Sequence, residues 1–360
     1  MKIAVVTCSS DSEITRDRAL IAGLKSDQRV RLTVIKNSYQ SFLRYPEVIW
    51  KLMRARLTRN PNVYVLTYRG RVLLPFVLWL AGHRPVIFDE SMIPITKPGN
   101  TSLAQPNSFK RFMSGLYRPL YKSWLRHCDF VLTDTQAQAE LSARTSHVNM
   151  RQYRIIPVGT DEKTFHPSDL SKSELVALPF QVLIDGDNSS SAELSLVLQA
   201  AEQLQSKTEI NFLVAGSSKS AANAVQKAQE SGAHVFYRET STPDELAVAI
   251  RESTLTLSGL LGTTIASQNV IPNQAYQSLA SAVTITIAQN EAPSALFADK
   301  DTVLLVGPED VPALVKVINW AANNRQTLVD IGRNGRHLYE RGFSQPFIDS
   351  ELSKIVDDLS

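Results

Sequence analysis

The 360-residue chain is poor in the residues that build metal sites and disulfide frameworks. It contains two cysteines, Cys8 and Cys128, which exclude a disulfide scaffold and offer no zinc-binding spacing. Its six histidines form no close cluster. We therefore expect no metal site and a chain that works in a reduced compartment.

Long apolar runs are also missing. The most apolar run is VLLPFVLWLAG (72–82), which has about half the length that a membrane-spanning helix needs and is interrupted by Pro75. The beginning, MKIAVVTCSSDSE, has too short an apolar run for a signal peptide. We therefore expect a strand at the beginning of the chain and a cytoplasmic location.

Charge is unevenly distributed along the chain. Residues 1–160 hold 24 Lys/Arg and 10 Asp/Glu, whereas residues 161–360 hold 14 and 25. Two halves of opposite sign predict two domains with different surfaces. The basic half suits anionic lipid or phosphorylated ligands, or it is a solvated surface that neutralises its neighbour. No RNA- or DNA-binding module is visible, so nucleic acid is not expected as a partner.

Short apolar, β-branched runs alternate with helical patterns in both halves, as in sheets of buried parallel strands. One helical pattern begins at Thr242 with Glu245 three residues later, the spacing of a capping box. The alternation predicts an α/β protein with two doubly wound domains, separated near residues 153–167. The predicted strands are 2–7, 31–36, 62–67, 85–90, 129–134, 180–185, 210–216, 233–239, 253–259, 282–288 and 302–307.

Three stretches carry a resemblance to a known family. They are IIPVGTDEKTFHP (155–167), GLLGTTIASQNVIPNQAYQSLASAVTIT (259–286) and RNGRHLYERGFSQPFIDSELSKIVDDL (333–359). In order and spacing they resemble the inter-domain stretch, the donor-site segment and the closing helices of family-4-type glycosyltransferases of the GT-B fold. The likeness covers most of the chain and is clearest from Asp129 onward.

The resemblance implies two Rossmann-like domains that face a central cleft. Residues 1–157 would form the acceptor-side domain and residues 158–340 the nucleotide-sugar-side domain. Residues 341–360 would form a C-terminal helix that returns to the first domain. An active member of the family transfers a sugar from a nucleotide-sugar substrate and retains the configuration at its anomeric carbon; no separate cofactor is implied.

The positions that match the family's donor-site pattern lack the expected charges. The lysine and glutamate positions hold Gln274 and Gln277. The arginine and lysine positions after the first strand of the second domain hold Asp187 and Ala192, and DGDNSSSAE contains no cation. In the first domain, the position where a histidine often stands holds Ser91. The set predicts a degenerate donor site.

The missing charges matter because a departing diphosphate must be stabilised. Losing one preorganised electrostatic group typically costs about 3–4 kcal/mol of barrier. A helix that begins with Pro272 at its first position would still present backbone N–H groups to a ligand. We therefore expect binding to persist where catalysis does not.

Several candidates have a functional and a plain interpretation. Gln274 and Gln277 share one helix face and are donor-site residues or a pair of surface amides. The loop that contains Gly262, Thr263 and Thr264 is part of the site or an ordinary strand-end loop. Tyr237 and Arg238 contact the nucleotide base or form a surface pair. Asp89 and Glu90, with Ser91, lie on the acceptor side or are caps and solvated turn residues.

The basic half contains helices that mix cations with aromatics. These helices lie in an anionic membrane interface, or their aromatics belong to the core and their cations to the solvated face. The candidate membrane-facing cations are Lys110, Arg111, Arg118, Lys122 and Arg126. A second stretch of this kind is SFLRYPEVIWKLMRARLTRN (41–60).

Two functions remain open. The chain is a non-catalytic glycosyltransferase-like protein that works with another glycosyltransferase, a glycan or a lipid-linked acceptor in polysaccharide assembly, or it is an active retaining glycosyltransferase with a rebuilt donor site. The several losses at one site favour the first. Cations that reach the diphosphate from elsewhere, such as Lys219 or Arg238, would favour the second.

Overall fold

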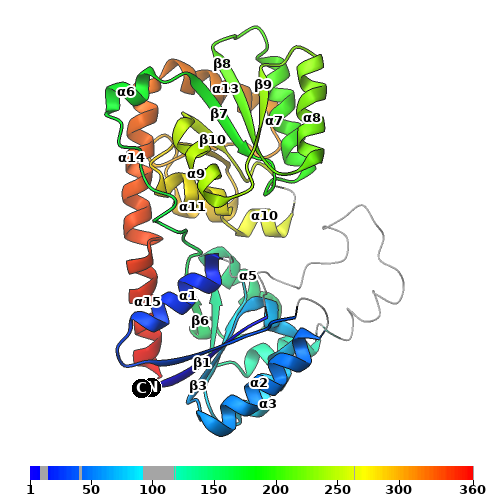
Figure 1. The fold of residues 1–360 in the computed structure, drawn as a ribbon, viewed down its shortest axis with the longest axis vertical. Helices are drawn as coiled ribbons and strands as arrows, with labels where there is room; N and C mark the ends of the chain where they lie inside the picture. The colour runs from blue at the N-terminus through cyan, green and yellow to red at the C-terminus, as the bar shows by residue number, and fades with distance from the viewer. Residues whose placement is uncertain (9–14, 40–42, 92–116, 118, 263, 360) are drawn as a thin grey trace, which may run out of the picture. The chain divides into compact units, whose positions relative to one another are not determined.

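The computed structural model describes residues 1–8, 15–39, 43–91, 117, 119–262 and 264–359 (Figure 1). The chain forms two compact units. The first contains Met1–Gly159 and Gln345–Ser360, and the second contains Thr160–Ser344.

The first unit is built on a six-stranded parallel sheet in the order β2-β1-β3-β4-β5-β6. The strands are β1 (Lys2–Thr7), β2 (Arg31–Lys36), β3 (Val63–Leu66), β4 (Val86–Asp89), β5 (Phe130–Thr133) and β6 (Tyr153–Ile155). The helices are α1 (Thr15–Ser26), α2 (Arg44–Thr58), η1 (Tyr68–Leu73), α3 (Leu74–Ala81), α5 (Gln136–Ser146), η2 (Met150–Gln152) and α15 (Gln345–Asp358).

Both faces of this sheet are covered, which explains the continuous apolar runs of its strands. In β1, Ile3 and Val5 pack with α1 and α15, whereas Ala4 and Val6 pack on the other face with α2 and α3. Helices α1 and α15 approach closely at Gly23, where an added Cβ would lie 2.6 Å from Leu352 Cδ1. The last helix of the chain therefore belongs to the core of the first unit.

The second unit repeats this plan with a six-stranded parallel sheet in the order β12-β11-β10-β7-β8-β9. Its strands are β7 (Phe180–Asp185), β8 (Ile210–Gly216), β9 (Val235–Glu239), β10 (Leu255–Leu257), β11 (Ile285–Ala288) and β12 (Leu304–Val306). Its helices are α6 (Lys172–Ala177), α7 (Ser191–Gln203), α8 (Lys219–Glu230), α9 (Pro243–Glu252), α10 (Ile265–Asn269), α11 (Asn273–Ala280), α12 (Glu291–Leu296), α13 (Val311–Asn323) and α14 (Arg325–Gly342).

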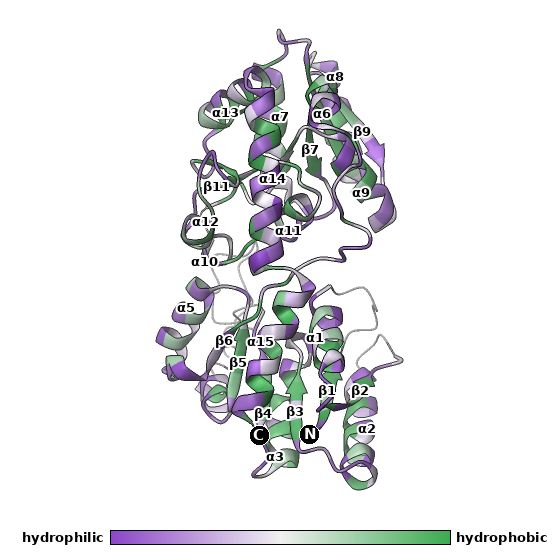
Figure 2. Ribbon diagram, turned by 90° about the vertical axis from the view of Figure 1, so that its left-hand side faces the viewer, coloured by the Kyte–Doolittle hydropathy of each residue, from purple (hydrophilic) through white to green (hydrophobic). Residues whose placement is uncertain are grey.

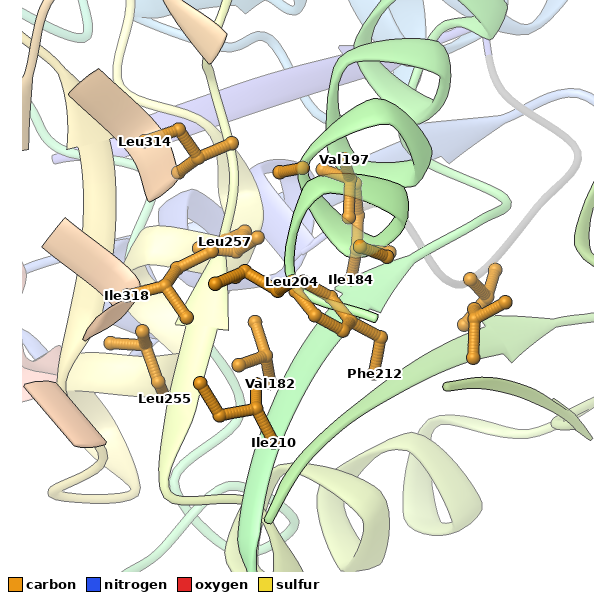
Figure 3. Packing of buried hydrophobic residues seen from close by; sticks show 14 of the residues in the cluster. Val182, Ile184, Val197, Leu204, Ile210, Phe212, Leu255, Leu257, Leu314 and Ile318 are labelled. Atoms are coloured by element: carbon orange, nitrogen blue, oxygen red, sulfur yellow. The ribbon is translucent and has the colours of Figure 1, made fainter. Parts of the chain in front are cut away.

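The core of the second unit lies between its sheet and the helices α7 and α13 (Figure 3). Val182 and Ile184 of β7 and Leu257 of β10 meet Val197 of α7 and Ile318 of α13. Figure 2 shows that hydrophobic residues gather on the strands of both sheets, whereas the helices alternate hydrophobic and hydrophilic residues. The alternation follows from the 3.6-residue period of a helix with one buried face.

The structure confirms the eleven predicted strands and the capping box of Thr242 and Glu245. It adds β6, which the sequence analysis missed in the stretch expected to separate the domains. It also corrects one helix start, because Pro272 is the N-cap of α11 and Asn273 is its first residue. No helix in the described ranges is long and apolar enough to cross a membrane.

Candidate functional site

The carboxyl edge of the second unit's sheet is where an open α/β fold places its ligands. Six connections follow the strands there, at 186–190, 217–218, 240–242, 258–264, 289–290 and 307–310. They contain most of the residues that the sequence analysis assigned to a donor site. None of the six contains a lysine or arginine in its sequence. Lys219 begins α8 directly after the second connection and is exposed.

The connection after β10 contacts the start of α11. Gly259 has a left-handed backbone (φ 63°), and a Cβ at this position would lie 2.5 Å from Pro272 Cγ. Only glycine tolerates both the backbone angle and this close approach. The contact places the N-terminus of α11 at the carboxyl edge of β10.

Two carboxylates and an amide hold the same connection in place. Glu193, in the first turn of α7, accepts a hydrogen bond from Leu260 N at 3.0 Å, and burial raises its pKa. Glu309 accepts a hydrogen bond from Gly262 N at 3.2 Å, and Asn290 Nδ2 donates to Leu261 O at 2.8 Å. The start of α7, where Ala192 lies, is thereby joined to the connection after β10. Glu193 was not predicted from the sequence, although it directly follows Ala192.

The N-terminus of α11 carries unpaired amides. Gln274 is only 2% exposed, and neither its Oε1 nor its Nε2 has a hydrogen-bond partner among the described residues. Gln277 Oε1 is likewise buried and unpartnered in that part of the chain. Leaving such a group unpaired costs about 1–3 kcal/mol. The plain interpretation of Gln274 as a surface amide is therefore wrong, because packing buries its side chain.

Asp187 is bound at the start of α8. Its Oδ2 accepts hydrogen bonds from Ser217 N at 2.8 Å and Ser217 Oγ at 3.0 Å, and its Oδ1 accepts one from Ser218 N at 2.9 Å. Ser218 is the N-cap of α8. The carboxylate thus occupies backbone donors of the kind that bind anions at a helix N-terminus.

Tyr237 lies at the same turn as Asp187, whereas Arg238 is paired elsewhere. The Tyr237 hydroxyl donates to Gly216 O at 2.5 Å, and burial raises its pKa, assisted by the Asp187 carboxylate. Arg238 Nη1 lies 2.6 Å from Glu252 Oε2 in an ion pair on the surface. The partner of Arg238 on the surface is therefore Glu252 and not Tyr237, and a contact of either residue with a base stays a prediction.

At the carboxyl edge of the first unit's sheet, Arg16 binds two buried aspartates. Its Nε lies 2.8 Å from Asp89 Oδ1 and its Nη1 lies 2.6 Å from Asp134 Oδ1. Burial raises the pKa of Asp134 to about 7. Ser91 Oγ also donates to Asp89, at 3.1 and 3.2 Å. Sequence reasoning missed Arg16 and Asp134, which lie far from Asp89 in the chain.

Glu90 is enclosed separately. Its carboxylate accepts hydrogen bonds from Tyr121 Oη at 2.7 Å and Ser142 Oγ at 2.5 Å, and burial raises its pKa to about 7. Asp89 and Glu90 are therefore neither caps nor solvated turn residues, since both are buried and satisfied by internal partners. An acceptor-side role for Asp89, Glu90 and Ser91 stays a prediction.

Some predicted residues lie outside the described ranges. They are Lys110, Arg111, Arg118 and Thr263. Lys122 and Arg126 are described, and Arg126 Nη2 donates to Ser146 O at 3.2 Å. In the same segment, Tyr121 is buried and Trp124 packs against the core, which agrees with the core interpretation for these two aromatics. Within the described ranges, no three His, Cys, Asp or Glu residues are placed to hold a metal ion.

The chain is similar to known proteins in structure and not in sequence. No protein-family model and no curated protein sequence matches the chain. Sucrose-phosphate synthase from Thermosynechococcus elongatus superposes with a TM-score of 0.78 over 100% of this chain and 99% of its own, at 15% identity. Anabaena Alr3699/HepE in complex with UDP gives 0.74 over 99% and 100%, at 13% identity. The lipopolysaccharide outer core galactosyltransferase WaaB gives 0.65 over 99% of both chains, at 11% identity. The chain has the GT-B fold of these glycosyltransferases.

Proposed function

We propose that the chain is a glycosyltransferase-like protein that binds a nucleotide or nucleotide sugar and does not transfer the sugar. One observation carries the proposal: the six connections at the carboxyl edge of the second unit hold no lysine or arginine. Breaking the bond between sugar and diphosphate develops negative charge on the leaving group, and such charge needs preorganised cations or N–H donors.

The charges that are present oppose an anion. The connections themselves contain Asp187, Glu309 and Asp310. Glu193, in the first turn of α7, accepts a hydrogen bond from the connection after β10. Asp187 also occupies two backbone N–H groups before α8 that would otherwise serve a phosphate. A glycosyltransferase with this site would lack the cations that stabilise the negative charge of the departing diphosphate.

The N-terminus of α11 retains hydrogen-bonding groups for the uncharged sugar or ribose of a ligand. Pro272 gives α11 no side-chain cap, so the first turn of the helix retains backbone donors. The orphaned amide of Gln274 and the carbonyl of Gln277 lie in that turn and the next. An amide offers both donor and acceptor atoms to sugar or ribose hydroxyls. We assign the residual binding to α11.

Calorimetric titration with UDP and GDP tests this assignment. The protein should bind one of them weakly, and Gln274→Met should weaken that binding while the protein stays folded. Gln268→Met is the matched control, because Gln268 Nε2 already donates to Gly262 O at 2.9 Å. Unchanged affinity in Gln274→Met would contradict the role of α11.

We further propose peripheral contact with an anionic membrane, at its cytoplasmic face, through α2. Trp50, Met53 and Leu57 stand at i, i+3 and i+7 of this helix and are 59%, 45% and 83% exposed. Lys51, Arg54 and Arg56 lie on the same helix, and the Arg54 guanidinium is 5.5 Å from the Trp50 ring centre. An exposed apolar row flanked by cations suits a headgroup interface. The surface would bring the chain to a lipid-linked acceptor or to a partner glycosyltransferase in polysaccharide assembly.

A further inference from the structure

A cavity of about 330 Å³ lies at the amino edge of the second unit's sheet, opposite the connections described above. Its lining includes Thr254 and Thr284, which directly precede β10 and β11, and Leu178, which lies two residues before β7. All of its lining residues belong to the second unit. The volume falls within the range of small-molecule sites, about 300–1,000 Å³.

The lining is cationic. Of the described residues, four arginines contribute to it, Arg251, Arg325, Arg333 and Arg336, together with His337, whereas no Asp or Glu does. Arg251 Nη1 donates to Thr164 O at 3.1 Å, and Arg336 Nη1 donates to Ala280 O at 2.7 Å. These bonds orient the two guanidinium groups. Arg336 Nε is also paired with Glu340 Oε1 at 2.8 Å. Because a guanidinium has five N–H donors, each group has others to offer.

Arg325 is half-buried in the cavity wall. Its guanidinium donates to Leu178 O and lies 5.4 Å from the Phe180 ring centre. Burial lowers the pKa of Arg325, and no carboxylate is paired with it in the described ranges. A bound anion would supply the missing charge.

A buried hydroxyl also lacks a partner. Ser281 is 2% exposed and lines the cavity, and its Oγ is buried without a hydrogen-bond partner among the described residues. The wall is fixed by Gly332 of α14, where an added Cβ would lie 2.3 Å from Ala282 O. The loop and the helix therefore hold Ser281 in one place.

Part of the remaining surface of the cavity is apolar. Side chains from α14, from the connection after α11 and from the segment around α6 provide it, namely Leu170, Leu175, Leu178, Val283, Leu328 and Val329. A purely inorganic anion would leave these side chains without contact. The cavity combines a cationic wall with a surface for a small apolar group.

We propose that this cavity binds a small organic phosphate that carries an apolar group. A phosphomonoester carries a charge of about −1.5 to −2 at neutral pH and has three acceptor oxygens, which several guanidinium groups can share. Ser281 Oγ donates to the same phosphate. The cavity meets the C-terminal end of α11, where Ser281 is the C-cap, whereas the nucleotide-binding proposal concerns the N-terminal end of this helix, so neither proposal depends on the other.

Titration calorimetry with phenyl phosphate on the full-length protein tests the proposal. Phenyl phosphate should bind with one-to-one stoichiometry and more tightly than inorganic phosphate or phenol. Arg333→Gln should weaken it about tenfold, as expected for the loss of one charge-assisted hydrogen bond. Arg333 is exposed, so the substitution leaves the fold intact. Arg325→Gln should weaken binding at least as much.

Arg341→Gln is the matched control, because Arg341 is an exposed arginine of α14 that does not line the cavity. Equal weakening by Arg341→Gln would overturn the proposal in favour of diffuse charge attraction. Absence of binding, or inorganic phosphate binding as tightly as phenyl phosphate, would also overturn it. Titration with UDP on the same variants should give unchanged affinity, which separates this cavity from the site proposed at the N-terminus of α11.

Discussion

The carboxylate of Asp187 accepts a hydrogen bond from the backbone N–H of Ser218, at 2.9 Å. With the two bonds from Ser217, it fastens the connection after β7 to the start of α8. Glycosyltransferases of the family that the sequence resembles carry an arginine at the position matching 187, where it would face a diphosphate. In this chain the side chain at that position instead stabilises the fold.

We predict that Asp187→Ala lowers the free energy of unfolding by about 1–3 kcal/mol, because it leaves Ser217 N and Ser218 N without a charged acceptor. Asp187→Asn should cost less, since its carbonyl still accepts one bond. Urea unfolding followed by circular dichroism measures both. Asp187→Arg should destabilise as much as Asp187→Ala, so restoring the family's arginine alone should not rebuild a donor site. Equal stability of all four proteins would contradict this role.

Replacing Gln274 should stabilise the fold, in contrast to replacing Asp187. Its buried amide has no partner in the described ranges, so Gln274→Met removes two orphaned polar atoms at similar volume. We expect the free energy of unfolding to rise by about 1 kcal/mol, at the lower end of the cost of leaving a buried polar group unpaired. Gln268→Met should not be stabilising, because it breaks the bond to Gly262 O. A destabilised Gln274→Met would show that the amide already has a partner.

Glu90 predicts a pH dependence of stability. Its pKa in the folded protein is raised to about 7 by burial, above the ordinary value of 4.5. The protonated form is favoured by the fold, so its contribution is complete below pH 4.5 and is lost as pH rises through 7. Glu90→Gln stays neutral and shows no such loss. Between pH 4.5 and 7.5 the wild type should lose roughly 3 kcal/mol relative to Glu90→Gln. If the free energies of unfolding of the wild type and Glu90→Gln changed equally with pH, the raised pKa of Glu90 would be contradicted.

The exposed row on α2 predicts membrane binding. The protein should pellet with vesicles of phosphatidylserine and phosphatidylcholine, and less with phosphatidylcholine alone or at high salt. Trp50→Ala with Leu57→Ala should reduce pelleting several-fold. Leu296→Ala, which removes an exposed leucine of the second unit, is the control. Pelleting that is equal on neutral vesicles would exclude an anionic interface.

The strands were predictable because each is a short run of apolar or β-branched residues, and burial on both sheet faces requires such runs. β6 was not, because Tyr153, Arg154 and Ile155 form a run of three with a cation at its centre. The capping box was predictable because Thr242 and Glu245 interact locally. Local patterns therefore predicted most of the fold.

The site was less predictable because its contacts are long-range. The burial of Gln274 depends on tertiary packing, and the contact of Gly259 with Pro272 that places α11 has no sequence signal. Arg16 reaches Asp89 across 73 residues. Likewise, the arginines of the cavity come from α9 and α14, and only the folded second unit brings them together.

The second unit is proposed to bind a nucleotide or nucleotide sugar without transferring the sugar. The most direct measurement is the release of free glucose from UDP-glucose, and of the sugar from a GDP-sugar, by the purified protein over hours, with an active GT-B glycosyltransferase as the positive control. We predict release no faster than in buffer, together with weak binding of UDP or GDP. Sugar release above the buffer rate that is abolished by mutation at Gln274 or Gln277 would contradict the account and show an active transferase.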